Sequence, residues 1–114
     1  MKHHNSERRC AERIAISLPA TLVYGDQNFQ SKALDISLCG MSLITDKKLP
    51  ENQPIQISIS LPSYEQSNII NLSANVIRCS SFKTKFLHGM VFKHLNPHQK
   101  LVIQEFSSFH NRLN

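Results

Sequence analysis

Alternation of apolar and polar residues is the feature that most limits how this chain can fold. In the segment IQISISL, residues 55–61, every odd-numbered residue is Ile or Leu and every even-numbered one is Gln or Ser. The same period of two runs through residues 14–24 and 69–79. Because successive side chains of a strand point to opposite faces, this period predicts strands with one buried face.

Three further segments have the length and composition of strands. They are FQSKALDIS at 29–37, GMSLIT at 40–45 and FLHGMVF at 86–92. GDQN at 25–28 is a turn signal, and KKLPENQP at 47–54 is a charged loop that contains prolines. Six short strands joined by brief turns favour an antiparallel barrel or sandwich.

The end of the chain has a helical pattern. Asn96 is a good N-cap, Pro97 suits the first helical position, and Gln99 lies three residues past the cap. The apolar residues that follow fall on one helical face: Val102, Phe106, Phe109 and Leu113. We therefore expect a helix that lies across the barrel or closes one of its ends.

Composition limits the class of protein. The 114 residues are 40% hydrophobic and 18% charged, which suits a single globular domain. No apolar run approaches the roughly 20 residues of a membrane span, and MKHHNSERRC lacks the apolar core of a signal peptide. We expect a cytoplasmic protein without membrane insertion. Its net charge of +5 favours an anionic partner: nucleic acid, an acidic membrane surface or a small phosphorylated ligand.

The cysteines and histidines do not predict a metal site. The three cysteines lie far apart without a CxxC pair, so we expect reduced thiols rather than disulfides or zinc ligands. His94 and His98 are four residues apart, but Pro97 between them marks a helix start. The two imidazoles should therefore not share a helical face.

Three arginines crowd together just before the first predicted strand: Arg8, Arg9 and Arg13. An arginine side chain is a flat fork of donors that pairs bidentately with phosphate or with the acceptor edge of guanine, and it also stacks on bases. Such a segment suits an anionic nucleotide. The alternative is a solvated tail whose charges are partly balanced by Glu7 and Glu12.

The segment DISLCG, which begins at Asp35, is the second polar cluster. On a strand, Asp35 and Ser37 project from one face, while Ile36 and Leu38 project into the barrel. The carboxylate can accept hydrogen bonds from a guanine ring nitrogen and its exocyclic amine. Gly40 lets a flat ligand approach the backbone or lets the chain turn tightly. The alternative is a polar outer face that ends in a turn glycine.

Together the two clusters resemble the motifs of the PilZ domain family. RxxxR corresponds to Arg9–Arg13, and DxSxxG corresponds to Asp35–Gly40. HGMVFKHL at 88–95 is similar to the last strand of the family, and VIRC at 76–79 is similar to the strand before it. The helix after Pro97 has a counterpart in the family as well.

This resemblance implies a mainly β fold, a six-stranded antiparallel β-barrel with a C-terminal α-helix. It divides the chain into a flexible tail, 1–6, and a single PilZ-like domain, 7–114. Within that domain it implies an arginine-bearing ligand loop at 7–13, barrel strands at 14–93 and the C-terminal helix at 97–112.

The resemblance also implies that the protein binds cyclic di-GMP, a bacterial second messenger, with no other cofactor. The matching ligand-binding positions are Arg9, Arg13, Asp35, Ser37 and Gly40. In the family, an arginine directly before RxxxR, here Arg8, is associated with two intercalated copies of the ligand. Arg78, near the end of the fifth strand, is a further candidate, with a plain surface charge as its alternative.

We expect binding to order the arginine segment of a monomeric receptor, which then signals to a protein partner. Two other functions stay open. One is a small basic nucleic-acid-binding barrel, although no outward row of aromatic residues is visible. The other is a ligand-independent PilZ adaptor in pilus or motility machinery, although such members usually lack both motifs. We expect no enzyme, because no nucleophile has a plausible base beside it.

Overall fold

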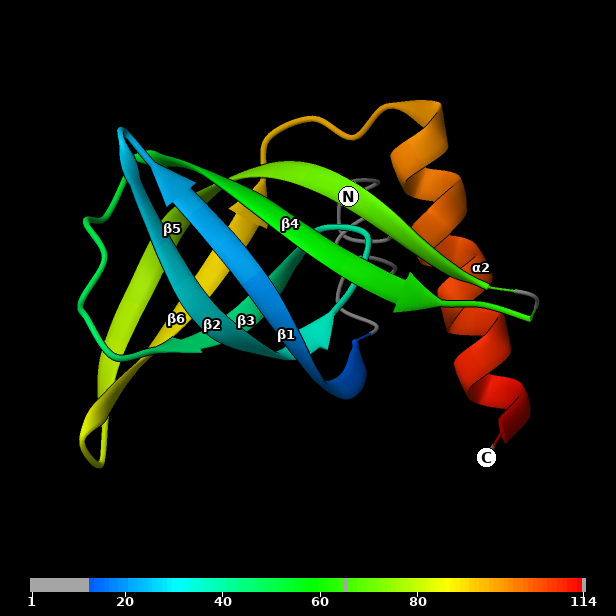
Figure 1. Ribbon diagram of the computed structural model, residues 1–114, viewed down its shortest axis with the longest axis horizontal. Coiled ribbons are helices and arrows are strands. Elements are labelled where there is room, and N and C mark those ends of the chain that lie inside the picture. The colour runs from blue at the N-terminus through cyan, green and yellow to red at the C-terminus, as the bar shows by residue number, and fades with distance from the viewer. Residues whose placement is uncertain (1–12, 65, 114) are drawn as a thin grey trace, which may run out of the picture.

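The computed structural model describes residues 13–64 and 66–113. Its six strands form a closed barrel in the order β1-β2-β3-β6-β5-β4, and all neighbours are antiparallel (Figure 1). A helix follows the last strand. The predicted mainly β fold with a C-terminal helix is confirmed. The elements are β1 (Ile14–Tyr24), β2 (Gln27–Ile36), β3 (Gly40–Thr45), β4 (Pro54–Pro62), β5 (Ser67–Phe82), β6 (Lys85–Phe92) and α2 (Pro97–Leu113).

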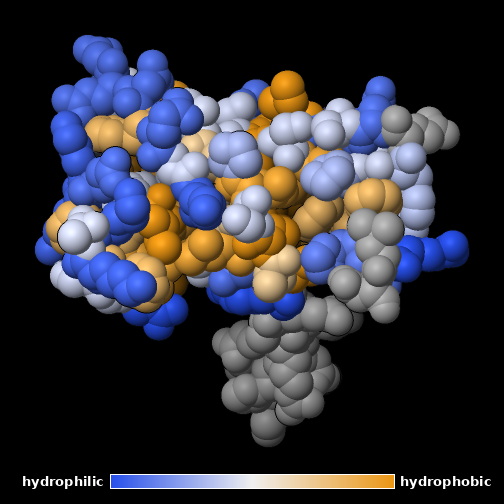
Figure 2. Space-filling view, turned by 60° about the horizontal axis from the view of Figure 1, so that its bottom comes forward, coloured by the Kyte–Doolittle hydropathy of each residue, from blue (hydrophilic) through white to orange (hydrophobic). Residues whose placement is uncertain are grey.

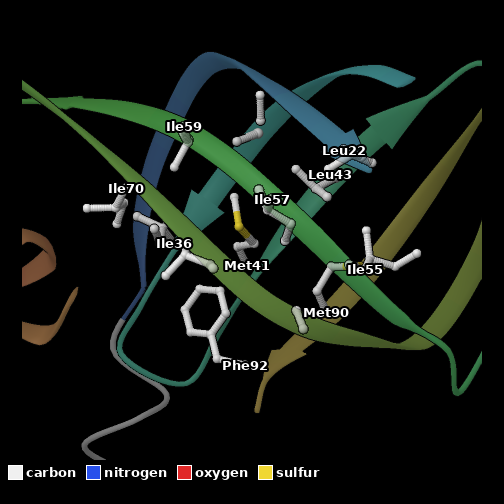
Figure 3. Close-up of a cluster of buried hydrophobic side chains, with 14 of the residues drawn as sticks. Leu22, Ile36, Met41, Leu43, Ile55, Ile57, Ile59, Ile70, Met90 and Phe92 are labelled. Atoms are coloured by element: carbon white, nitrogen blue, oxygen red, sulfur yellow. The ribbon is translucent and has the colours of Figure 1, made fainter. Parts of the chain in front are cut away.

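The alternating strand residues fill the barrel, as the period of two predicts. The side chains of Ile55, Ile57 and Leu61 from β4 are completely buried. They share the interior with Met41 from β3 and Met90 from β6 (Figure 3). Burial of each such side chain stabilises the fold by about 1.5–3 kcal/mol. The interior is therefore a packed core, and a ligand has to bind on the outer surface.

The β5–β6 hairpin is longer than the sequence pattern indicates. The strand patterns at 69–79 and 86–92 predict that SSFKTK at 80–85 is a connection, but β5 continues to Phe82 and only Lys83 and Thr84 form the turn. Beyond Val76, β5 pairs with β6 on one side, because its pairing with β4 ends at Asn75. In this stretch β5 is the edge strand beside β6, which pairs with β3 on its other side. The side chains of 77–82 are mostly exposed on both faces of β5, so its polar sequence carries no period of two.

Helix α2 begins with the predicted capping box. The Asn96 backbone N–H donates to the Gln99 side chain at 2.8 Å, and the Gln99 N–H donates to the Asn96 side chain at 2.7 Å. Val102 and Phe106 are buried as expected, and Ile103 joins them. The helix packs against β4 and β5 and covers one end of the barrel (Figure 1).

The cysteines depart from the expectation of reduced thiols. Cys39, in the turn between β2 and β3, is disulfide-bonded, whereas Cys79 on β5 is a free thiol. Wide spacing in the sequence does not show which thiols meet in space, so this part of the prediction is wrong.

In the described part of the chain, no helical segment combines the length and apolarity of a membrane span.

Candidate ligand-binding site

An ion pair joins the two motifs that the sequence singled out. Arg13 directly precedes β1, and Asp35 lies near the end of β2. Antiparallel pairing of these strands, with Ala15 opposite Asp35, brings the two side chains together. Arg13 Nη1 donates to Asp35 Oδ1 at 2.8 Å. The arginine side chain is 42% exposed and the aspartate side chain 25%, so both remain accessible to a ligand. The other two predicted arginines, Arg8 and Arg9, lie outside the described residues.

Ser37 does not stand beside Asp35 on an outer strand face. Strand β2 ends at Ile36, and Ser37 is 3% exposed in the turn that follows. Its Oγ accepts hydrogen bonds from the backbone N–H groups of Cys39 (3.1 Å) and Gly40 (3.2 Å). The predicted outward direction is wrong because strand alternation stops where the chain leaves the sheet. The hydroxyl shapes the turn instead.

The same departure from the sheet changes the environment of Leu38. This side chain was expected inside the barrel with Ile36, but it is 36% exposed, whereas Ile36 is fully buried. Leu38 and Val91 line a hollow of about 240 Å³ beside the turn, together with the cationic side chains of Lys93 and Lys100. The turn therefore carries an apolar residue next to positive charge on its outer side.

Gly40 has a packing role at the start of β3. A Cβ atom at this position would lie 2.0 Å from the backbone carbonyl oxygen of Met90. The Ser37 N–H also donates to the Gly40 carbonyl at 2.9 Å. Gly40 therefore lets β3 lie close against β6 and closes the turn that positions Asp35.

A row of register partners extends the site across the outer face of the barrel. Asp35 pairs with Ser42 on β3, Ser42 pairs with Gly89 on β6, and Gly89 pairs with Arg78 on β5. Ser42 and Gly89 were not predicted as site residues. A glycine inside a strand often marks a place where another group lies close to the backbone. Only the strand register shows that the residue beside Gly89 is Arg78.

Arg78 lies in the last third of β5, which continues to Phe82. Its side chain is exposed and crosses Gly89: a Cβ there would lie 3.6 Å from Arg78 Nε and from Nη2. With strands about 4.8 Å apart, the three steps from β5 to β2 span roughly 14 Å. A cation thus stands at each side of this surface: Arg13 beside Asp35, and the Arg78 guanidinium over Gly89. Between them Ser42 has only a small side chain.

This arrangement suits a flat, anionic ligand. Arg13 and Arg78 supply guanidinium forks that pair with phosphate or stack on an aromatic ring. Asp35 supplies an acceptor for N–H groups. The small side chain of Ser42 lets a planar ring lie close to the sheet, beside the Arg78 guanidinium that covers Gly89.

The family of the chain follows from comparison with known sequences. The family model described as PilZ domain matches residues 7–109, and this range includes Arg13, Asp35 and Arg78. The chain belongs to the PilZ domain family. A comparison with curated protein sequences found no match.

Solved PilZ structures share the fold of this chain. The Bacillus subtilis inhibitor of motility (MotI/DgrA) matches with a TM-score of 0.75 and 15% identity over 88% of this chain, which spans 50% of that protein. The PilZ domain of YcgR from Escherichia coli, solved with c-di-GMP, matches with a TM-score of 0.70 and 16% identity over 90% of this chain and 91% of that one. The Borreliella burgdorferi PlzA protein, also in complex with c-di-GMP, matches with a TM-score of 0.59 and 14% identity over 97% of this chain and 55% of that one.

Proposed function

We propose that this PilZ protein is a receptor for cyclic di-GMP. The Arg13–Asp35 contact carries the proposal, since it places residues of both sequence motifs at one spot on the barrel surface. The family assignment supports it, as do the fold relatives YcgR and PlzA, whose structures contain c-di-GMP.

The chemistry of the ligand fits the side chains of the site. Cyclic di-GMP carries two phosphates and two guanines. Arg9 and Arg13 pair with the phosphates or with the acceptor edge of a guanine, and Asp35 accepts from the donor edge. Ser37 and Gly40 act by holding the turn rather than by reaching the ligand. Arg78 stacks on a guanine, with its guanidinium between the ring and Gly89. Arg8 helps to hold a second, intercalated copy.

The energetics allow the ligand to take over the existing ion pair. A partly exposed ion pair such as Arg13–Asp35 stabilises a protein by only about 0–1 kcal/mol. Hydrogen bonds to charged groups contribute about 1.5–3 kcal/mol each. Fixing the backbone of the arginine segment costs about 1–2 kcal/mol per residue. A handful of phosphate and guanine contacts therefore offsets this cost and supports micromolar binding.

We further propose that the receptor acts as a monomer in the bacterial cytoplasm and has no catalytic activity. Rearrangement of segment 7–13 around the ligand creates a surface that a downstream protein recognises. Size-exclusion chromatography with light scattering, with and without ligand, tests the monomer. Dimerisation that requires cyclic di-GMP would contradict it.

Calorimetric titration with cyclic di-GMP tests the receptor function. Saturable binding is expected for the wild-type protein, and Arg9→Ala and Asp35→Ala should each abolish it. Lys83→Ala, at the turn of the β5–β6 hairpin, is the matched control and should bind like the wild type. Two ligands per chain, reduced to one by Arg8→Ala, would support the intercalated pair. A folded sample that releases no heat at high ligand concentration would overturn the proposal.

A further inference from the structure

A groove lies on the barrel at the other end of β2 from Asp35. Its volume is about 490 Å³, and its walls come from β2, the end of β3 and the β5–β6 hairpin. A second hollow of about 450 Å³ continues it along the start of β2. The β1–β2 turn and the β5–β6 hairpin lie at the end of the barrel away from α2 (Figure 1). None of the ligand-site residues lines this groove.

The first half of β2 has an open edge along the groove. Pairing of β2 with β3 begins only at Lys32, opposite Ile44, whereas β1 pairs with β2 from Gln27 onward. After Thr45 the chain leaves the sheet, and Leu49 from the following loop is buried in the core. Among the described residues, no backbone hydrogen bond joins 27–31 to that loop.

The hairpin geometry determines which backbone groups face this edge. The β1–β2 turn has two residues, so its closing pair, which includes Gln27, exchanges both backbone hydrogen bonds. Hydrogen-bonded and non-hydrogen-bonded pairs then alternate along the strand. Phe29 and Ser31 therefore bond to β1, while the N–H and C=O groups of Asn28 and Gln30 point to the open edge.

The groove is cationic with an apolar wall. Four lysines and one aspartate line the two hollows, a net charge of +3: Lys32, Lys47, Lys83, Lys85 and Asp46. Asp46 is 80% exposed and pairs with Lys85 at 2.5 Å, so a stronger acidic partner can displace it. Phe82 is 46% exposed and Ile44 lies beside it in the wall. Figure 2 shows hydrophilic residues dense at the left end of the molecule, the end that carries the β1–β2 turn and the β5–β6 hairpin in Figure 1, and hydrophobic residues exposed toward the middle.

We propose that this groove binds an extended acidic segment of a partner protein, which adds to β2 as an extra strand. Its backbone pairs with Asn28 and Gln30, its carboxylates pair with the lysines, and an apolar side chain packs against Phe82. Hydrogen-bonding groups at every second residue match a polypeptide backbone, and side-chain pockets supply specificity. A nucleic acid would need a row of stacking aromatics. The docking surface does not depend on whether the site at Asp35 binds cyclic di-GMP.

The test starts from a displayed library of random peptides of about ten residues, the length of a long strand, selected on the full chain. Enriched peptides should alternate Asp or Glu with apolar residues. The tightest one is then synthesised and titrated into variants. Gln30→Pro removes an N–H at the open edge and should weaken binding roughly tenfold or more. Lys32→Glu should do the same, whereas Arg112→Glu on α2 should have no effect.

A second measurement covers the case in which Gln30→Pro does not fold. The same peptide, N-methylated at alternate residues, is titrated into the wild-type protein, because methylation in the correct register removes the donors that pair with β2. One register should lose binding and the other should keep it. Equal binding in both registers, or enrichment of peptides without acidic residues, would overturn the proposal. So would groove-dependent binding of a single-stranded oligonucleotide or an anionic vesicle in place of the peptide, or self-association that Gln30→Pro abolishes.

Discussion

The guanidinium of Arg78 lies across Gly89, on the register row that leads through Ser42 to Asp35. Three hydrogen-bonded strand pairs fix the backbone positions of these four residues, so their order along the row does not depend on the conformation of a loop. The row places the Arg78 guanidinium, which can pair with an anion or stack on a ring, at one side of a flat surface. The Arg13–Asp35 ion pair lies at the other side. The outer face of the barrel therefore presents a preformed half of the proposed ligand site, independent of the segment that precedes Arg13.

The first prediction concerns Arg78. Arg78→Ala should weaken cyclic di-GMP binding about tenfold, since it removes the cation that we propose stacks on the ligand. Arg78→Lys should recover only part of the loss, because lysine keeps the charge but not the planar fork. Calorimetric titration measures both. If both variants bind like the wild type, Arg78 is a plain surface charge.

The two strand glycines make a matched pair for the second prediction. Gly40→Ala should destabilise the fold by about 1–3 kcal/mol or more, because its Cβ would meet the Met90 carbonyl oxygen at 2.0 Å. Gly89→Ala should leave stability nearly unchanged, since the nearest atoms would be 3.6 Å away on the flexible Arg78 side chain. Urea unfolding measures both free energies. Equal losses would show that β3 and β6 are packed less closely at Gly40 than the structure has them.

The barrel could be predicted from the sequence because its signals are local. A period of two, turn residues and the capping box at Asn96 each report on a few consecutive residues. The site was harder to predict. The contact of Arg13 with Asp35 follows from motif order, but Ser42 and Gly89 join the site through strand register, which pairs residues far apart in the sequence.

Ser37 and the open edge of β2 illustrate what local patterns leave out. Alternation predicted an outward Ser37, but the strand ends one residue earlier. The free edge beside Gln30 arises because β3 is shorter than β2, and a sequence pattern gives strand length only approximately. In both cases the structure depends on the residue at which strand pairing ends, which a local sequence pattern does not fix.

Ser37 carries the third prediction. Ser37→Ala removes the acceptor of the Cys39 and Gly40 N–H groups, so it should destabilise the fold by about 1–3 kcal/mol. Ligand affinity should fall as well, because the turn that positions Asp35 loosens. Ser37→Thr keeps the hydroxyl and should retain more of both properties. Urea unfolding and calorimetry on the same samples separate the two effects. Lower affinity with unchanged stability would mean that the hydroxyl reaches the ligand directly.

The last prediction concerns His88, which is completely buried on β6. The Thr45 hydroxyl donates to the Lys47 carbonyl, so His88 Nε2, 2.9 Å from Thr45 Oγ1, is the donor in their hydrogen bond. Among the described residues, His88 Nδ1 has no partner. Protonation would therefore place a second N–H where nothing accepts it, and burial lowers the pKa of His88 below its usual value of 6.5.

Because the pKa of His88 is lowered in the folded state, acid should reduce the stability of the protein. A histidine whose pKa is lower in the folded state stabilises the fold above the unfolded-state pKa, and this stability is lost as the pH falls. The free energy of unfolding should drop below pH 6.5, by at most about 1.4 kcal/mol per pH unit from this residue. Urea unfolding between about pH 8 and pH 5 measures it. His88→Gln should remove most of this slope, whereas His94→Gln, at an exposed position, should keep it. An unchanged slope in His88→Gln would assign the acid sensitivity to other groups.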